Sequence, residues 1–183
     1  MKYSLKKSHS IWMTGFPSSG KTTISKNFFL EFSKEFPTII LDSDECNKFF
    51  FSKRDYSKKE RNISTLKYIN LVKILLRTKC LIIISANHPF NSQRLLARKI
   101  LKKNYSELWV STNIEECKKR DVKKLFLKAK KNKLQNLIGH DLKFEKPNNY
   151  DLKIDAKNKS LDQSTKMIKD FLLYNKIIYA KKI

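Results

Sequence analysis

The chain has 183 residues, of which 40% are hydrophobic and 11% are aromatic. This composition supplies a hydrophobic core for one domain and excludes the class of intrinsically disordered proteins. The longest apolar run, Cys80 to Ile84, is too short to cross a membrane, and no apolar stretch of the length of a secretory signal follows the basic start of the chain. The three cysteines (Cys46, Cys80 and Cys117) are far apart, which predicts no disulfide or zinc site and fits a reducing cytoplasm.

The net charge of +23 comes from 40 Lys and Arg residues against 17 Asp and Glu residues, and it favours polyanionic partners. Only six of these cations are arginines, although arginine is the residue that reads phosphates and bases through paired hydrogen bonds. A lysine-rich and glycine-poor composition is also typical of an AT-biased genome. Nucleic acid is therefore not the expected partner.

Short apolar runs alternate with amphipathic stretches, as in a parallel sheet covered by helices. Strands are expected over residues 10–14, 37–41, 80–85, 107–110 and 152–154. Helices are expected over residues 21–34, 57–78 and 92–102, from 113 onward, and over 121–136 and 160–174. The run 80–85 is the most apolar strand and is expected at the centre of the sheet. These elements predict one doubly wound α/β domain, residues 1–183, with a mainly parallel five-stranded sheet and helices on both faces.

Two sequence patterns of the capping-box form predict helix starts, Ser57 with Glu60 and Asn113 with Glu116. The helix that starts at Ser57 is expected to have an apolar face at helical spacing, made of Leu66, Ile69, Ile74 and Leu75 with Leu71 and Val72 between them. The expected helix over 121–136 carries six lysines.

The sequence from Gly15 to Thr22 matches G-x-x-x-x-G-K-[ST] between an expected strand and an expected helix. In such a loop the glycines let backbone N–H groups surround a phosphate at the helix N-terminus. Lys21 would reach the β- and γ-phosphates of ATP, and the Thr22 hydroxyl would bind Mg²⁺. The expected ATP-binding residues in this segment are Gly15, Ser18, Ser19, Gly20, Lys21, Thr22 and Thr23.

Asp42 and Asp44 follow the second expected strand, at the edge of the sheet where the phosphate loop lies. A carboxylate there could orient a magnesium-bound water or accept a proton from an acceptor hydroxyl. Asp is also common as a helix cap after a strand. Together with Lys21, the two aspartates are the candidate catalytic residues.

The order of the motifs resembles the adenylylsulfate kinase family over residues 11–155. Residues 41–44 (LDSD) resemble its L-D-G-D, residues 56–61 (YSKKER) its F-S-x-x-D-R, and residues 84–90 (ISANHPF) its strand ending in S-P-Y. Residues 117–121 (CKKRD) resemble C-x-x-R-D. Residues 125–130 and 139–147 resemble the family's lid. The resemblance implies a P-loop kinase with a lysine-rich lid over about residues 121–147.

This resemblance implies transfer of the ATP γ-phosphate, with Mg²⁺, to the 3′-hydroxyl of adenylyl sulfate (APS). Arg120 and lid lysines would then close over the ATP phosphates, and the family also suggests a homodimer. The implied acceptor-binding residues are Asp44, Asn47, Tyr56, Arg61, Ser64, Asn87, His88, Lys128, Leu137 and Gly139.

The differences from the family pattern lie in the part that binds the acceptor, at Asn47, Ser64, Leu66, His88, Asn91 and Leu137. Family arginines are absent at three of these positions, a serine is replaced by His88, and a lid aromatic is replaced by Leu137. Each lost arginine removes charge-assisted hydrogen bonds of about 1.5–3 kcal/mol, so weak APS binding is expected. His88 is either an acceptor contact or acid/base group, or a histidine bonded to backbone.

Two alternatives to APS phosphorylation stay open at this point. One is the same transfer to another nucleotide, such as cytidine diphosphoramidate, because a smaller base would suit Leu137. The other is a non-catalytic, nucleic-acid-binding P-loop module, which only the charge favours.

Overall fold

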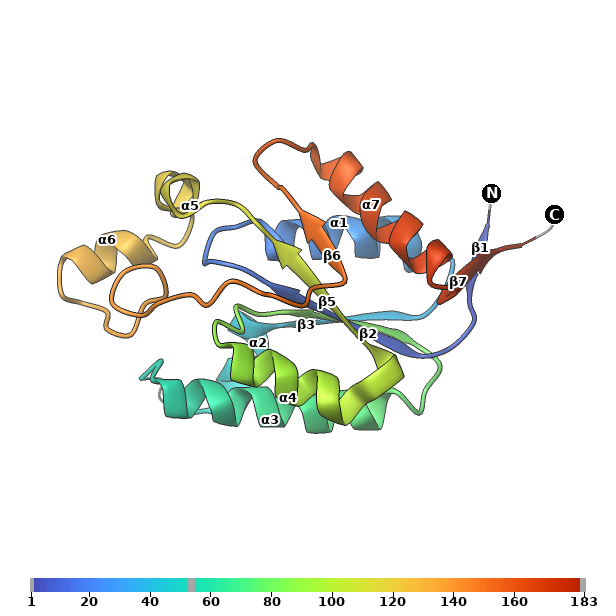
Figure 1. Ribbon diagram of the computed structural model, residues 1–183, viewed down its shortest axis with the longest axis horizontal. Helices are drawn as coiled ribbons and strands as arrows, with labels where there is room; N and C mark the ends of the chain where they lie inside the picture. Colours follow the sequence, from blue (N-terminus) through green and yellow to red (C-terminus); the bar gives the residue numbers. More distant parts are fainter. Residues whose placement is uncertain (1, 53–54, 182–183) are drawn as a thin grey trace.

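The structure is a computed structural model that describes residues 2–52 and 55–181 (Figure 1). The two ends of the predicted domain, residues 1 and 183, lie outside the described residues. The main sheet has five parallel strands: β2 (His9–Thr14), β3 (Thr38–Asp42), β4 (Leu81–Ser85), β5 (Tyr105–Val110) and β6 (Leu152–Ile154). Their order is β3-β4-β2-β5-β6, so β2 is the central strand. The prediction that the most apolar strand is central was wrong, although β4 is an interior strand and fully buried.

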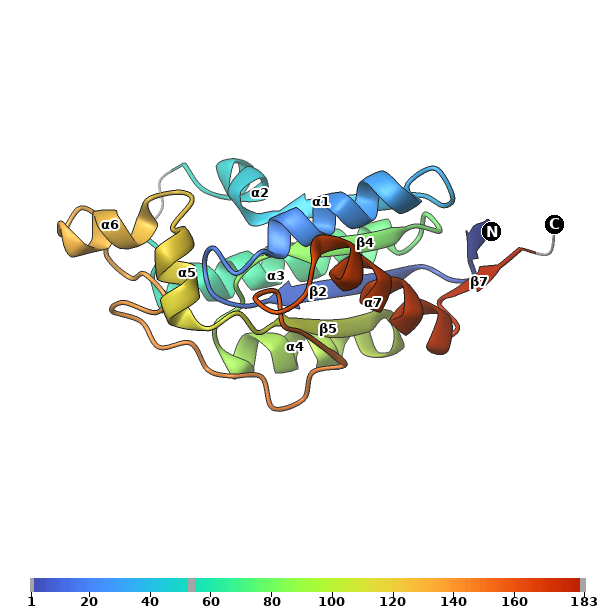
Figure 2. The ribbon, with the colours of Figure 1, turned by 90° about the horizontal axis from the view of Figure 1, so that it is seen from above.

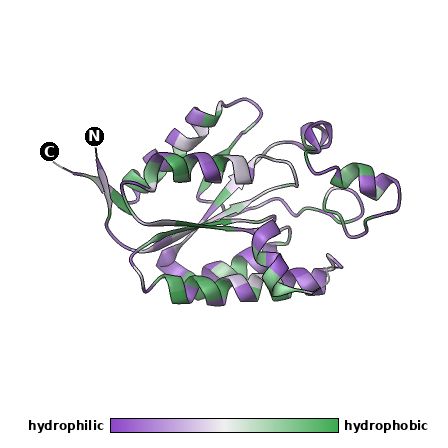
Figure 3. Cartoon of the chain, turned by 180° about the vertical axis from the view of Figure 1, so that it is seen from behind, coloured by the Kyte–Doolittle hydropathy of each residue, from purple (hydrophilic) through white to green (hydrophobic). Residues whose placement is uncertain are grey.

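Helices cover both faces of this sheet, which confirms the doubly wound α/β fold. Helices α1 (Lys21–Phe32) and α7 (Leu161–Tyr174) lie on one face, and α3 (Lys58–Leu75) and α4 (Asn91–Leu101) lie on the other (Figures 1 and 2). Alternate side chains of β2 enter the two layers. Ile11 and Met13 belong to the cluster that contains α1 and α7, whereas Trp12 belongs to the cluster with α3 and α4. Hydrophobic residues accordingly concentrate along the strands (Figure 3).

Four shorter elements were not predicted. A two-stranded antiparallel sheet pairs β1 (Tyr3–Leu5) with β7 (Ile178–Ala180) near the two ends of the chain. Helix α2 (Ser43–Phe50) follows β3 directly, and the 3₁₀ turn η1 (Lys102–Asn104) precedes β5. The two missed strands have only three residues each and lie outside the main sheet, so they show no clear periodicity.

The apolar face predicted for α3 was partly wrong. Leu66 and Ile74 are 45% and 60% exposed, whereas Tyr68, Ile69 and Val72 are buried. Apolar residues occur all around this helix, so their spacing does not define one face. The buried side also includes polar residues, which line a pocket described below.

The predicted capping residues start their helices. The Ser57 hydroxyl accepts a hydrogen bond from the Glu60 N–H at 3.1 Å, and the Asn113 side chain accepts one from the Glu116 N–H at 2.8 Å. The Glu60 carboxylate does not complete a reciprocal box at α3, because it accepts from the N–H groups of Asp55 and Tyr56. This cap therefore also shapes the chain just before α3.

The long helix predicted over 121–136 was wrong. Helix α5 (Ile114–Arg120) ends before it, and only α6 (Leu125–Lys130) is helical within it. The backbone of Asp121, Lys124, Asn132 and Asn136 is left-handed, with φ between 21° and 58°, which no right-handed helix allows. Closely spaced lysines without acidic partners repel each other in a helix. The segment 121–147, called the lid below, lies with α5 at the end of the molecule opposite the two termini (Figures 1 and 2).

A small hydrophobic cluster holds the lid together. Leu137, Phe126 and Ala129 pack with Cys117 of α5. The Asp141 carboxylate accepts hydrogen bonds from the N–H groups of Leu137, at 2.5 Å, and Asn136. Among residues 2–52 and 55–181, no helix is long and apolar enough to cross a membrane.

Candidate active site

The loop from Gly15 to Gly20 connects β2 to α1 at the carboxyl edge of the sheet. A Cβ atom on Gly15 would meet the Val110 carbonyl oxygen at 2.6 Å, and Gly20 precedes α1 with a φ of 108°. Only glycine fits both positions without strain. The Thr112 hydroxyl donates a hydrogen bond to the Ser19 carbonyl oxygen at 2.8 Å. The loop is therefore preformed.

The Lys21 side chain folds back over this loop. Its Nζ donates hydrogen bonds to the carbonyl oxygens of Phe16, at 2.7 Å, and Gly15, at 3.2 Å, and to the Ser19 hydroxyl at 3.3 Å. Burial lowers the pKa of Lys21 to about 7. An anion beside Nζ would restore the charged form, because opposite charges favour each other's ionised states. Lys21 is thus positioned to bind a phosphate group, as a site for ATP requires.

Three side-chain oxygens gather beside the loop. The Thr22 hydroxyl donates to Asp42 Oδ2 at 2.7 Å and lies 3.3 Å from the Ser85 hydroxyl. Asp42 Oδ1 also accepts from the Asp44 N–H at 2.9 Å and caps α2, which confirms the helix-cap interpretation, while the catalytic role of Asp42 stays a prediction. Mg²⁺ prefers a few protein oxygens together with substrate phosphates, and this set fits that pattern. Among the described residues, no cluster of three or more His, Cys, Asp or Glu side chains offers a metal site made by protein alone.

The pocket over the phosphate loop contains the predicted ATP-binding residues except Gly15, which lies beneath it. Its lining includes Ser18, Ser19, Gly20, Lys21, Thr22, Thr23, Asp44, Arg120 and Lys123. The Arg120 guanidinium donates to Glu116 at 2.9 Å and to the Ala156 carbonyl oxygen at 3.1 Å. These bonds hold Arg120 beside Gly20, and its closure over ATP phosphates stays a prediction.

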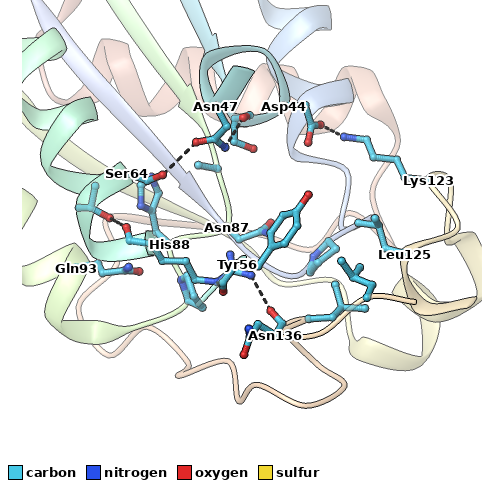
Figure 4. Close-up of a pocket in the computed structure, with 18 of the residues that line it drawn as sticks. Asp44, Asn47, Tyr56, Ser64, Asn87, His88, Gln93, Lys123, Leu125 and Asn136 are labelled. Atoms are coloured by element: carbon cyan, nitrogen blue, oxygen red, sulfur yellow. Dashed lines mark hydrogen bonds and ion pairs between the residues drawn. The ribbon is translucent and has the colours of Figure 1, made fainter. Parts of the chain in front are cut away.

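A second pocket adjoins the first and is enclosed by α2, α3, the β4–α4 turn and the lid (Figure 4). Eight predicted acceptor residues line it: Asp44, Asn47, Tyr56, Arg61, Ser64, Asn87, His88 and Leu137. The other two predicted acceptor residues, Lys128 and Gly139, are not part of its lining, and their role stays a prediction. Lys128 is exposed on α6, and Gly139 packs against Phe16 and Ile114.

Only some of the residues that differ from the family pattern face this pocket. Leu66 is half-exposed on α3, and the Asn91 side chain accepts a hydrogen bond from Arg94 outside it. Asn47 and Ser64 do line it and bind each other, since the Ser64 hydroxyl donates to Asn47 Oδ1 at 3.1 Å. Fewer of the substitutions therefore bear on the acceptor than the sequence predicted.

Arg61 links the second pocket to the lid. Its guanidinium donates to the carbonyl oxygens of Tyr56, at 2.8 Å, and Asn136, at 2.9 Å. The Asn136 side chain donates in turn to the Asp55 carbonyl oxygen at 2.8 Å. These bonds join the segment before α3 to the lid across the pocket.

Asp44 lines both pockets and forms an ion pair with Lys123 of the lid (Figure 4). Sequence reasoning did not single out Lys123, nor the pocket residues Thr65, Tyr68 and Gln93. Lys123 lies two residues after the Arg120-Asp121 pair of a recognised motif, and this position could have identified it as a candidate site residue. The α3 residues could not be assigned to a pocket before the rotation of the helix was known.

A preformed phosphate loop, a carboxylate at the junction of two pockets and a lid over both define a P-loop kinase. A family model described as adenylylsulphate kinase matches residues 7–155. The chain therefore belongs to the adenylylsulfate kinase family, whose members are phosphotransferases with an alcohol group as acceptor.

Individual relatives agree with this assignment. The chain is 33% identical over 172 residues to the adenylyl-sulfate kinase of Buchnera aphidicola subsp. Acyrthosiphon pisum, covering 92% of this chain and 82% of that protein. It is 34% identical over 164 residues to that of Prochlorococcus marinus, covering 86% and 79%. A solved APS kinase from Mycobacterium tuberculosis, in complex with AMPPNP and APS, shares the fold with a TM-score of 0.83, 24% identity and coverage of 91% and 98%. These comparisons do not support a nucleic-acid-binding module or a cytidine acceptor.

Proposed function

We propose that this protein transfers the γ-phosphate of ATP to the 3′-hydroxyl of APS and so forms 3′-phosphoadenylyl sulfate. The observation that carries the proposal is the position of Asp44 in the lining of both pockets. A kinase needs its two substrates side by side, with a proton acceptor where they meet. The names of the relatives and the APS-bound structural neighbour favour APS as the acceptor.

Each residue has a role on this proposal. The loop N–H groups and Lys21 would hold the triphosphate and stabilise charge on the transferred group. Thr22 and Asp42 would hold Mg²⁺, which when bound neutralises phosphate charge. Asp44 would accept the proton of the 3′-hydroxyl, and Tyr56 and Arg61 would anchor the acceptor.

The altered acceptor residues support weak APS binding. Asn47 stands where the family has an arginine, and Leu137 stands where it has an aromatic residue. Two lost interactions of about 1.4 kcal/mol each correspond to roughly a hundredfold in affinity. We therefore expect a KM for APS well above that of a family member with the full set.

The test is a parallel assay of ATP with APS and with cytidine diphosphoramidate, following the phosphorylated nucleotide. Turnover of APS, abolished in Lys21→Ala, supports the proposal. Turnover of the cytidine compound alone would keep a kinase and remove APS as its substrate. A micromolar KM for APS would show that the altered residues are compensated. The homodimer and the cytoplasmic location predicted above remain predictions, and sedimentation of the purified protein tests the first.

A further inference from the structure

His88 occupies an unusual position in the wall of the second pocket. It follows β4 in the turn before α4, where its backbone is left-handed with a φ of 40°. Its side chain packs between Trp12 and Tyr68, with ring centroids 4.8 Å and 5.9 Å away. Only 6% of the residue is exposed. The ring is thus held by aromatic packing at the edge of a binding pocket.

The backbone of this residue is fixed separately. The His88 carbonyl oxygen accepts a hydrogen bond from the Arg94 guanidinium at 2.5 Å, and Arg94 pairs with the buried Glu107 at 3.0 Å. The Thr14 hydroxyl lies 3.3 Å from the same carbonyl oxygen. Strained backbone that the surroundings enforce in this way is found at functional sites. These contacts position the ring without using its nitrogens.

The Nε2 atom of His88 is buried and has no hydrogen-bond partner among the described residues. A buried polar atom left without a partner costs about 1–3 kcal/mol, so such an atom in a native protein needs a reason. Burial, together with the nearby Arg94, lowers the pKa of His88 to about 3. The ring is therefore uncharged at neutral pH, and it can neither attract phosphate as a cation nor shuttle protons readily.

The Arg94 guanidinium binds the His88 backbone and is not part of the pocket lining, whereas the neighbouring lining residues Asn47, Ser64 and Gln93 are uncharged. Ser64 binds Asn47, and the Gln93 side chain donates to Asn62 at 3.0 Å. The charged pair of Asp44 and Lys123 lies on the other side of the pocket (Figure 4). The pocket thus has a charged side, where phosphoryl transfer is proposed, and a neutral polar side that contains His88.

We infer that His88 is a specificity-determining residue that exchanges a hydrogen bond with the acceptor nucleotide through its uncharged imidazole ring. This inference rests on the proposed function, because it takes the second pocket to be the acceptor site. Binding of the acceptor supplies the partner that Nε2 lacks. A neutral hydrogen bond takes the place of recognition by arginine on this side of the pocket.

The first test uses the wild-type protein labelled with [¹⁵N]histidine, which has only three histidines to assign. The protein is saturated with AMPPNP and then titrated with APS. The inference expects the Nε2 signal of His88 to shift along the APS saturation curve, while the signals of the remote His9 stay unchanged. Saturation with APS and no change at His88 would overturn it.

The second test compares two variants by calorimetric titration with APS. His88→Phe keeps a ring but removes both nitrogens, and it is expected to weaken APS binding about three- to tenfold with AMPPNP affinity unchanged. His88→Asn tolerates a left-handed backbone and keeps a neutral polar group, so it should recover part of the loss. His9→Asn is the matched control, a buried histidine outside both pockets. Equal APS affinity in wild type and His88→Phe would contradict the inference, whereas failure of the wild type to bind APS would instead retire the proposed function.

Discussion

Lys21 combines burial, three hydrogen bonds within its own loop and a pKa lowered to about 7. With this pKa, Lys21 is expected to be mostly uncharged in the free protein at pH 8, where its amine donates to the two carbonyl oxygens and accepts from the Ser19 hydroxyl. Nucleotide phosphates beside Nζ favour the charged form. The residue that stabilises the phosphates should consequently change its protonation when they arrive.

We predict that nucleotide binding takes up about 0.9 proton at pH 8, from a free pKa near 7 to a bound pKa near the ordinary value for lysine. Calorimetric titration with AMPPNP in two buffers of different ionisation enthalpy measures this uptake. Lys21→Met is the control, because it preserves most of the side-chain volume and cannot take up the proton. Equal uptake by the two proteins would show that Lys21 is already charged when free.

The two aspartates have different surroundings, and their variants should differ accordingly. Asp42 binds Thr22 and caps α2, so Asp42→Asn should weaken binding of the magnesium nucleotide but change stability little, because Asn caps a helix as well as Asp does. Asp44→Asn should leave nucleotide affinity nearly unchanged and lower kcat at least tenfold, since it removes the proton acceptor. Steady-state rates and nucleotide titrations separate the two effects. Near-wild-type kcat in Asp44→Asn would exclude this residue from the chemistry.

At the level of elements, the sequence predicted what depends on strong local signals. The phosphate loop, the capping residues Ser57 and Asn113, and the five strands of the main sheet all follow from short motifs or dense apolar runs. The lid does not, because its shape depends on left-handed residues such as Lys124 and Asn136. Its contacts to Asp55 and Arg61 also join parts of the chain far apart in sequence. Lysine and asparagine carry little information about such a fold.

The second pocket was predicted in its residues more than in its geometry. Eight of the ten residues carried over from the resemblance do line it. The exceptions, Lys128 and Gly139, are in the lid, where the irregular backbone breaks the correspondence between motif position and side-chain direction. The exposure of Leu66 has a similar origin, since a helix with apolar residues on every side has no sequence-defined phase.

The lid itself can be tested at Gly139. Its φ is 85°, and a Cβ there would meet Ile114 Cδ1 at 2.5 Å and the Phe16 ring at 3.2 Å. Gly139→Ala should therefore cost about 1–3 kcal/mol of lid stability and weaken APS binding more than AMPPNP binding, because Leu137 nearby lines the second pocket, the proposed acceptor site. Hydrogen exchange of residues 125–142 and the two titrations measure these effects.

The matched control for Gly139→Ala is Lys124→Gly, which relieves a left-handed residue with a φ of 53°. This variant should leave exchange in the lid unchanged or slower. If both variants accelerated exchange equally, backbone conformation would not be what holds the lid in place.

For the whole molecule, the net charge of +23 is opposite in sign to that of nucleotide substrates, which are polyanions. The two pockets contain Lys21, Arg61, Arg120 and Lys123, and most other lysines lie on the surface. A net positive field raises the local concentration of anionic ligands and is screened by salt. The same net charge makes the folded chain repel itself, which lowers its stability.

Two buried histidines at different ends of the sheet make stability depend on pH. His9, at the start of β2, is 3% exposed, and burial with nearby Lys7 lowers its pKa to about 4. Burial likewise lowers the pKa of His88 to about 3. In the unfolded chain both imidazoles bind protons below their ordinary pKa of about 6.5. The unfolded state therefore binds more protons than the native state between pH 6.5 and pH 4, and stability falls as the pH falls through this window.

We predict that each histidine lowers the free energy of unfolding by about 2 kcal/mol between pH 7.5 and pH 5, or about 4 kcal/mol for the pair. Urea unfolding of the wild type and of the double variant His9→Asn/His88→Asn at both pH values measures the difference, and carboxylates common to the two proteins cancel. The double variant should start less stable at pH 7.5, because His9 loses its hydrogen bond to Ser106, yet lose less on acidification. An identical loss in both proteins would mean that these imidazoles are charged in the native state, which their burial and unpartnered nitrogens argue against.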